Sequence, residues 1–156
     1  MSAHSGSPDF AGLATVVPFT DRVGVYADAL VRLTAGLLLM PHGAQKLFGW
    51  FGGPGLEGAG QMFATKLGLP PWLAIVAGVV EFFGGALLAL GIATRVVGLV
   101  VAGMMFFVVF AVHLPQGFFW SHGGYEYPLL WGVVALSYAL RGGGHCSIDA
   151  LLWTRR

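Results

Sequence analysis

Charged residues are scarce in this chain of 156 residues. They make up 10% of the sequence, whereas a soluble domain usually carries about 25%, and the mean hydropathy is +0.78. Because so few charged residues cannot cover a surface that faces water, we predict an integral membrane protein. The net charge of +1 gives no indication of a nucleic-acid or polyanionic partner.

Cysteine is nearly absent, and the sequence shows no cleavable signal peptide. Cys146 is the only cysteine, which excludes a disulfide framework, a CxxC redox pair and a cysteine metal cluster. Segment 1–24 mixes Ser, Gly, Pro and Asp without a basic stretch that leads directly into an apolar run. We expect this segment to be a flexible leader.

Long apolar runs occupy most of the remaining chain. A spanning helix needs about 20 apolar residues, and lipid offers no partners to an unpaired backbone, which favours helices over strands. The sequence therefore predicts an all-α, four-helix transmembrane bundle within residues 25–140, followed by a tail over 141–156. The expected spans are 25–48, 71–92, 95–114 and 124–140, the last being the shortest.

Small residues and short turns indicate how the spans pack. Gly98-x-x-x-Ala102 and the group around Gly78, Gly85 and Ala89 provide surfaces on which two helix backbones can approach closely. The turn at 91–95 is very short, so the second and third spans should form an antiparallel hairpin. The two longer loops are rich in aromatic residues, as is typical of the membrane interface.

The basic residues lie unevenly on the two sides of the predicted membrane. One side carries Arg22, Arg95, Arg141, Arg155 and Arg156. The opposite side carries Lys46 and Lys66. Because cytoplasmic loops are enriched in Lys and Arg, we expect both termini to be cytoplasmic.

Arg32 and Glu81 are ionisable residues inside predicted spans. A charge at mid-bilayer costs about 3 kcal/mol on insertion scales, and an opposite charge within reach reduces that cost. We expect Arg32 and Glu81 to pair inside the bundle. The pair would either fix the helix register or take part in catalysis through binding or proton movement, and the sequence leaves both roles open.

A second polar group interrupts the first span near its outer end. His42, Gln45 and Lys46 follow Pro41, which frees a backbone carbonyl and permits a kink. His113 ends the third span on the same side. With Glu81, these residues are candidates for a small-molecule binding site, whereas the alternative is that Lys46 simply extends to the interface.

The histidines could bind one of two more specific ligands, a haem or a metal ion. His42 and His113 could ligate a haem from facing helices, although no slot for a macrocycle is evident. His113, His122 and Glu126 are suitable metal ligands, but no tight spacing supports a site, so no metal is predicted.

The polar residues and their neighbours resemble the DoxX family of small bacterial membrane proteins. The resemblance lies in four motifs in order, over about residues 30–151. They are Arg32 with Gly36, H42-G-A-Q-K46, E81-F-F-G-G85 with L90-G-I-A-T-R95, and the tail G142-G-G-H-C-S-I-D149. The tail departs from the usual Gly-Pro-Gly-Arg, because Gly143 replaces the proline and His145 the arginine.

The resemblance implies a four-helix membrane protein and a link to redox chemistry. Relatives are similar to the membrane subunit of a thiosulfate–quinone oxidoreductase, and others are associated with membrane oxidoreductase complexes. A quinone-linked subunit is therefore the first hypothesis, with His42, Gln45, Lys46 and His113 in binding and Glu81 in proton relay. The sequence contains no flavin, iron–sulfur or haem motif, so such a subunit would need other membrane subunits to supply electrons.

Two other functions stay open. The chain could be a non-catalytic scaffold that docks through the aromatic runs Phe118-Phe119-Trp120 and Trp50-Phe51, unless these only anchor it at the headgroups. It could also be a small transporter, for which four spans would require a homo-oligomer.

Overall fold

The computed structural model describes the backbone of residues 13–153 and the side chains of residues 23–152. All regular structure in this part of the chain is helical. The α-helices are α1 (Leu13–Phe48), α2 (Gly55–Leu67), α3 (Trp72–Val79), α4 (Gly85–Leu90), α5 (Thr94–Val108), α6 (Glu126–Arg141) and α7 (Ile148–Trp153). Two π-helices, η3 (Val80–Gly84) and η4 (Val109–His113), continue α3 and α5. Three short 3₁₀ segments lie in the loops: η2 (Trp50–Gly52), η5 (Leu114–Gln116) and η6 (Trp120–His122).

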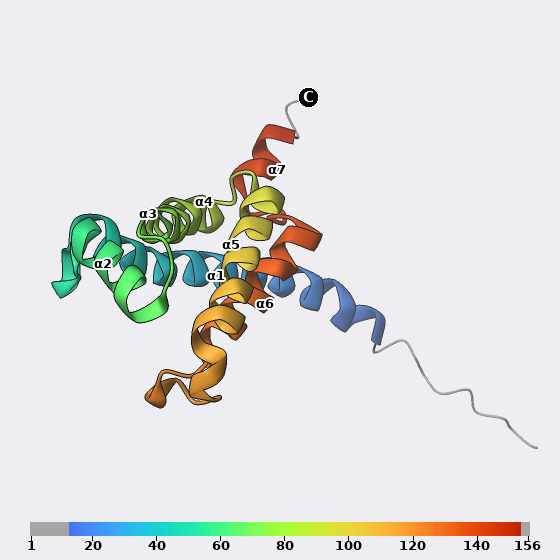
Figure 1. The fold of residues 1–156 in the computed structure, drawn as a ribbon. Helices are drawn as coiled ribbons and strands as arrows, with labels where there is room; N and C mark the ends of the chain where they lie inside the picture. Colours follow the sequence, from blue (N-terminus) through green and yellow to red (C-terminus); the bar gives the residue numbers. More distant parts are fainter. Residues whose placement is uncertain (1–12, 154–156) are drawn as a thin grey trace, which may run out of the picture.

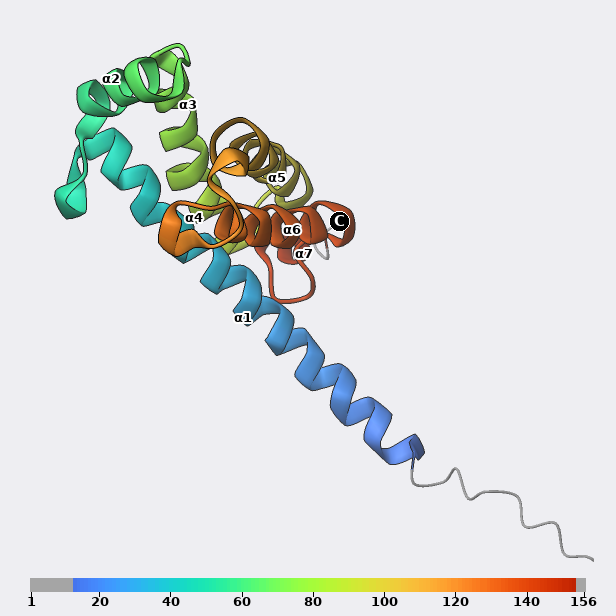
Figure 2. The same ribbon diagram turned by 60° about the horizontal axis from the view of Figure 1, so that its bottom comes forward.

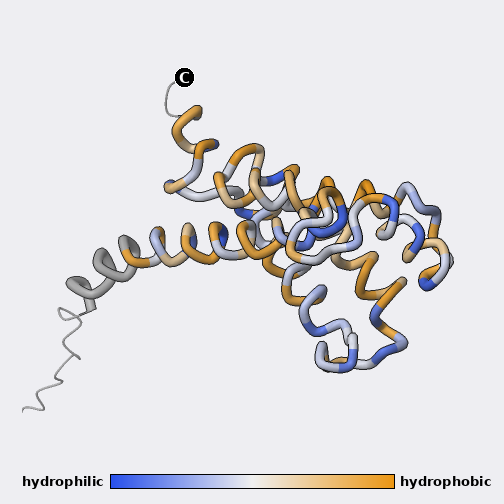
Figure 3. The backbone as a smooth tube through the Cα atoms, turned by 90° about the vertical axis from the view of Figure 1, so that its left-hand side faces the viewer, coloured by the Kyte–Doolittle hydropathy of each residue, from blue (hydrophilic) through white to orange (hydrophobic). Residues whose placement is uncertain are grey.

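Three helical stretches of the described chain are long and apolar enough to cross a membrane. They are Val23–Phe48, Trp72–Leu90 and Thr94–Gln116, which agree closely with the first three predicted spans. Figure 3 shows the hydrophobic character along α1. The fourth predicted span is helical as α6, but with 16 residues it is shorter than these three. The prediction of an all-helical membrane protein is confirmed.

Helix α1 is longer than the predicted first span. It begins at Leu13, so residues 13–24, assigned above to a leader, are helical, and residues 1–12 lie outside the described residues. Its N-terminal part extends beyond the other helices (Figure 2). The rest of α1 is contacted by α3, η3 and α4, while α5 and α6 form the most extensive helix pair (Figure 1).

Four glycines bring α1 and the α3–α4 rod into backbone contact. A Cβ atom on Gly36 would lie 2.4 Å from the carbonyl oxygen of Gly85, and one on Gly43 would lie 2.6 Å from that of Gly78. No side chain fits in either place. We call these four residues the glycine seam. Because Gly36 meets Gly85 and Gly43 meets Gly78, the two rods run antiparallel.

Small residues also join α5 to α6. A Cβ atom on Gly98 would lie 2.8 Å from the carbonyl oxygen of Ala135, as the Gly98-x-x-x-Ala102 spacing leads one to expect. Around this contact, Val101, Ala102 and Ala135 are almost completely buried. The described core is therefore a thin layer between closely packed backbones, and most large apolar side chains point outward to lipid.

The C-terminal tail folds back onto the start of α5 (Figure 1). The Asp149 carboxylate accepts hydrogen bonds from the backbone N–H of Ala93 (2.7 Å) and from the N–H (2.8 Å) and hydroxyl (2.7 Å) of Thr94. It thus caps the N-terminus of α5 from a distant segment. Partial burial raises the pKa of Asp149, but the hydrogen bonds from Thr94 and Ala93 and the charge of Arg32 outweigh it, and the pKa lies below its ordinary 3.8.

The glycine seam predicts a large difference between two Gly→Ala changes. G36A places a methyl group against the backbone of α4, and we expect overpacking to cost about 3 kcal/mol or to prevent folding. The control is G103A on α5, where a Cβ atom would meet nothing within 4 Å. That variant should be as stable as the parent or slightly more so. Thermal unfolding in detergent measures both, and equal loss in both variants would contradict the seam.

The cap predicts a pH-dependent effect of D149A. The ionised carboxylate stabilises the fold, so removing it should cost about 1 kcal/mol. Because the folded-state pKa is lowered, this contribution is present above the unfolded pKa, near pH 4, and is lost as the pH falls through the folded pKa. The unfolding free energies of parent and variant should therefore converge in acid. E57A, at an exposed acidic residue of α2, should behave like the parent; a D149A deficit that stays constant into strong acid would refute the cap.

Candidate functional site

Glu81 lies in the π-helical turn η3, in the middle of the second apolar helical stretch. It is only 8% exposed. A π-turn contains one extra residue per turn, is rare, and frequently occurs at functional sites. The backbone irregularity and the buried carboxylate therefore coincide at the same place in the helix.

The partner of Glu81 is Lys46 on α1. The Lys46 ammonium donates to a Glu81 carboxylate oxygen at 2.6 Å and lies 3.3 Å from the backbone carbonyl oxygen of His42. The side chains of Lys46 and Glu81 are 19% and 10% exposed. This ion pair compensates the buried charge that the composition otherwise avoids, while Lys46 keeps some access to the surface.

The expected Arg32–Glu81 pair is wrong. Arg32 instead donates to the carbonyl oxygens of Leu88 (2.8 Å), Ala89 (2.6 Å) and Cys146 (2.6 Å). The glycine seam explains the difference, because a Cβ atom on Gly43 would lie 2.4 Å from the backbone nitrogen of Phe82, which sets Glu81 near the level of Gly43. Arg32 lies about 16 Å away along α1.

Arg32 acts at the C-terminal end of the α3–α4 rod. It is 2% exposed, and its guanidinium binds carbonyls in the last turn of α4, where a cation is also favoured by the helix dipole. The contact with Cys146 adds the tail to the same point. These contacts assign Arg32 a structural role rather than one in chemistry beside Glu81.

His42 contacts Lys46 through its backbone carbonyl and α6 through its ring. Its exposed ring meets Trp131 edge-on, with ring centroids 6.4 Å apart. The Trp131 indole is held by a hydrogen bond from its N–H to the carbonyl oxygen of Ala35 at 3.2 Å. Gln45 packs beneath the first loop, where a Cβ atom on Gly53 would lie 2.5 Å from its Cα atom. Of the predicted site residues, Lys46 and Glu81 are therefore joined directly, and His42 is joined to them through its backbone carbonyl.

The polar contact of His113 is not with Lys46 or Glu81 but with the loop before α6. Its Nδ1 atom lies 2.5 Å from the carbonyl oxygen of Gly123, in the loop before α6. His122 contacts Ser121, and Glu126 accepts from the backbone N–H of Trp120. Among the described residues, no group of three or more His, Cys, Asp and Glu is placed to hold a metal ion.

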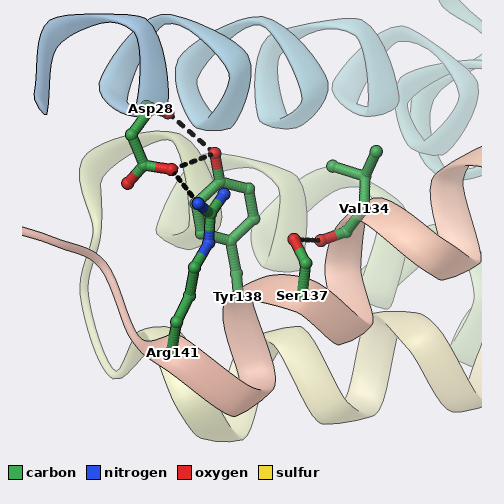
Figure 4. A network of polar contacts seen from close by, with 5 residues as sticks. All are labelled: Asp28, Val134, Ser137, Tyr138 and Arg141. Atoms are coloured by element: carbon green, nitrogen blue, oxygen red, sulfur yellow. Dashed lines mark hydrogen bonds and ion pairs between the residues drawn. The ribbon is translucent and has the colours of Figure 1, made fainter. Parts of the chain in front are cut away.

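A polar network joins α1 to α6 (Figure 4) and was not predicted from the sequence. The hydroxyl of the fully buried Tyr138 donates to the carbonyl oxygen of Asp28 at 2.7 Å. Arg141 forms an ion pair with Asp28, and its guanidinium lies 4.2 Å from the Tyr138 ring centroid. The sequence contained an indication of this network. Asp28 lies inside the first predicted span, and Arg141 follows the fourth predicted span on the same side of the membrane.

Comparison with known proteins places this arrangement in a family. A sequence profile of the DoxX family matches residues 27–114, which contain Arg32, the glycine seam, Lys46 and Glu81. The chain belongs to the DoxX family.

Two relatives cover most of this DoxX protein. It is 30% identical over 124 residues to a Bacillus subtilis (strain 168) protein named "Putative oxidoreductase CatD", a match that covers 80% of the chain and 85% of the relative. It is also 30% identical over 127 residues to an uncharacterized protein of Haemophilus influenzae, covering 80% and 89%. No solved structure matches the chain.

The ion pair predicts unequal effects of removing its two members. K46M leaves the Glu81 carboxylate buried without its cation, and we expect a loss of about 2 kcal/mol, less than for a fully buried pair because Lys46 is partly exposed. E81Q leaves an ammonium that can turn toward the surface, so its loss should be smaller.

Thermal unfolding of the two single variants and of K46M/E81Q in detergent measures the coupling between the two sites. The double variant should be more stable than the sum of the single losses indicates. Additive losses would show that the two residues do not interact.

Proposed function

We propose that this DoxX protein is a quinone-linked subunit of a membrane oxidoreductase complex. The observation that carries the proposal is the Lys46–Glu81 ion pair, which lies in an otherwise apolar helical region. It lies close to His42, an exposed residue whose backbone carbonyl oxygen is 3.3 Å from the Lys46 ammonium. The name of the Bacillus relative, an oxidoreductase, is consistent with this chemistry.

The residues suit the binding and protonation of a quinone. Reduction of a quinone to a quinol takes two electrons and two protons, which end on the two ring oxygens. His42 and Lys46 are donors that can hydrogen-bond a ring oxygen. The Glu81 carboxylate of the ion pair carries no proton, so after Lys46 gives one to the quinone, a proton taken up from water through Glu81 restores the ammonium across their 2.6 Å contact. The electrons come from a partner subunit that holds the redox cofactor.

We further propose that the chain crosses the bacterial inner membrane four times, with both termini cytoplasmic. Helix α6 is about 24 Å long, about 6 Å shorter than the hydrocarbon core of about 30 Å, so the residues that flank it would complete the crossing. Arg95, at the start of α5, donates to the carbonyl oxygen of Leu140 at 2.7 Å, so α6 ends at the level where α5 begins. If α5 crosses the membrane, this contact supports a return crossing by α6, and Arg95 and Arg141 lie on one side.

A scaffold function has support from one feature of the loop before α6. Phe119 and Trp120 are 65% and 60% exposed, and such aromatic side chains suit contact with a larger subunit. In that case the chain would assemble with its partner even when the polar site is altered.

Quinone retention tests the proposal. The protein is purified from its native membrane in mild detergent, and its lipid extract is analysed for quinone. We expect quinone in the parent and about fivefold less in H42A, since one hydrogen bond contributes about 1 kcal/mol. H122A is the matched control, because His122 is an equally exposed histidine on a loop. Absence of quinone from the parent, or equal amounts in H42A and H122A, would refute the proposal; normal assembly in both variants without quinone would favour the scaffold.

A further inference from the structure

An apolar groove of about 450 Å³ runs between α1 and α6. Its lining residues are Leu30, Val31, Thr34, Ala35, Leu38, Tyr127, Leu130, Trp131 and Val134. Small-molecule sites typically have volumes of about 300–1,000 Å³, whereas a helix with its side chains is about 10 Å across. The groove therefore has the size for a small molecule or a single hydrocarbon chain rather than a helix.

The groove is continuous with the candidate site. Trp131 forms part of its wall and also contacts the His42 ring. Leu38, another wall residue, precedes His42 by about one helical turn. A molecule lying in the groove would therefore have one end beside His42, and the hydrogen bond from Trp131 to Ala35 keeps that end formed.

The other end of the groove is polar and packed. Tyr138 follows the wall residue Val134 by about one turn and is fully buried. Its contacts with Asp28 and Arg141 (Figure 4) join α1 to α6 at this level. The groove is thus an apolar segment between a closed polar network and an open polar site.

The depth of His42 restricts what can occupy the groove. His42 lies about 9 Å along the helix before the end of α1, below the level expected for phospholipid headgroups. A phosphate there would lose its water, and His42 and Lys46 are too few donors to replace it, since Lys46 is already paired with Glu81. An uncharged ring whose oxygens only accept hydrogen bonds can bind at this depth, provided that an apolar chain leads away from it.

We propose that the α1–α6 groove binds the isoprenoid tail of a membrane quinone whose ring lies beside His42. This assignment rests on the proposed function and adds to it the position of the tail and a preference for long-tailed quinones. Thr34 and Ala35 are the smallest residues of the lining and would accommodate the methyl branches of such a tail, while Leu38 and Leu130 are exposed on either side.

Adjacent leucines on α1 provide a matched test. Leu38 lines the groove and is 53% exposed, whereas Leu37 is 51% exposed and lies outside the lining. L38W should fill the groove and weaken binding of a long-tailed ubiquinone or menaquinone about tenfold, the effect of losing about 1.4 kcal/mol of apolar contact. A quinone without the tail should bind L38W and the parent equally, and L37W should bind both quinones like the parent.

A second pair on α6 keeps the test valid if L38W does not fold. Leu130 lines the groove, whereas Val133 is similarly exposed but lies outside the lining. L130W and V133W therefore repeat the comparison. Variants are compared only when their thermal unfolding and elution match the parent.

The outcomes distinguish a wrong assignment of the groove from a wrong proposal for the function. Equal binding of the long-tailed quinone by L38W and L37W, with H42A still impaired, would overturn the groove and leave the quinone site in place. Failure of the parent to bind either quinone would overturn the proposed function itself. Loss of a copurifying phospholipid from L38W, with quinone binding unchanged, would assign the groove to a phospholipid chain and overturn the inference.

Discussion

The close approach of α1 to the α3–α4 rod is the constraint on which the described structure depends. Gly36, Gly43, Gly78 and Gly85 allow backbone contact along about two turns. Lipid supplies no hydrophobic force that drives helices together, so close packing and polar contacts must hold them. The seam provides the packing and also fixes the axial offset of the helices, which decides which polar groups can meet.

Two polar regions result from that offset, and they differ in character. At one end, Arg32 and Asp149 bind backbone groups, and Asp28, Tyr138 and Arg141 join α1 to α6. At the other end, Lys46 and Glu81 pair beside an exposed histidine. Groups occupied by backbone partners stabilise the helix ends, whereas His42 retains ring nitrogens for a ligand. The chemistry is therefore best sought at the Lys46 end.

The sequence predicts the helical architecture better than it predicts the contacts between side chains. Apolar runs predict the helices because their length and composition are sufficient, and glycine spacing indicates which surfaces are close. Neither determines how far one helix slides along another, so Arg32 was assigned to Glu81 instead of to the carbonyls of Leu88 and Ala89. The π-turn at Glu81 was not predicted, because one additional residue in a helix leaves no compositional signal. The resemblance to the family included the tail that contains Asp149. The capping role of Asp149 became evident only from the fold, which brings the tail to the start of α5.

The central claim is that the glycine seam sets Lys46, and not Arg32, opposite Glu81. Paired cysteines in native membranes test it most directly, in a C146S background that removes the natural thiol. With a short bifunctional thiol reagent, which spans the space left by the two long side chains, K46C/E81C should form an intramolecular cross-link, and R32C/E81C should not. A cross-link in R32C/E81C together with none in K46C/E81C would contradict the register described above and the site built on it.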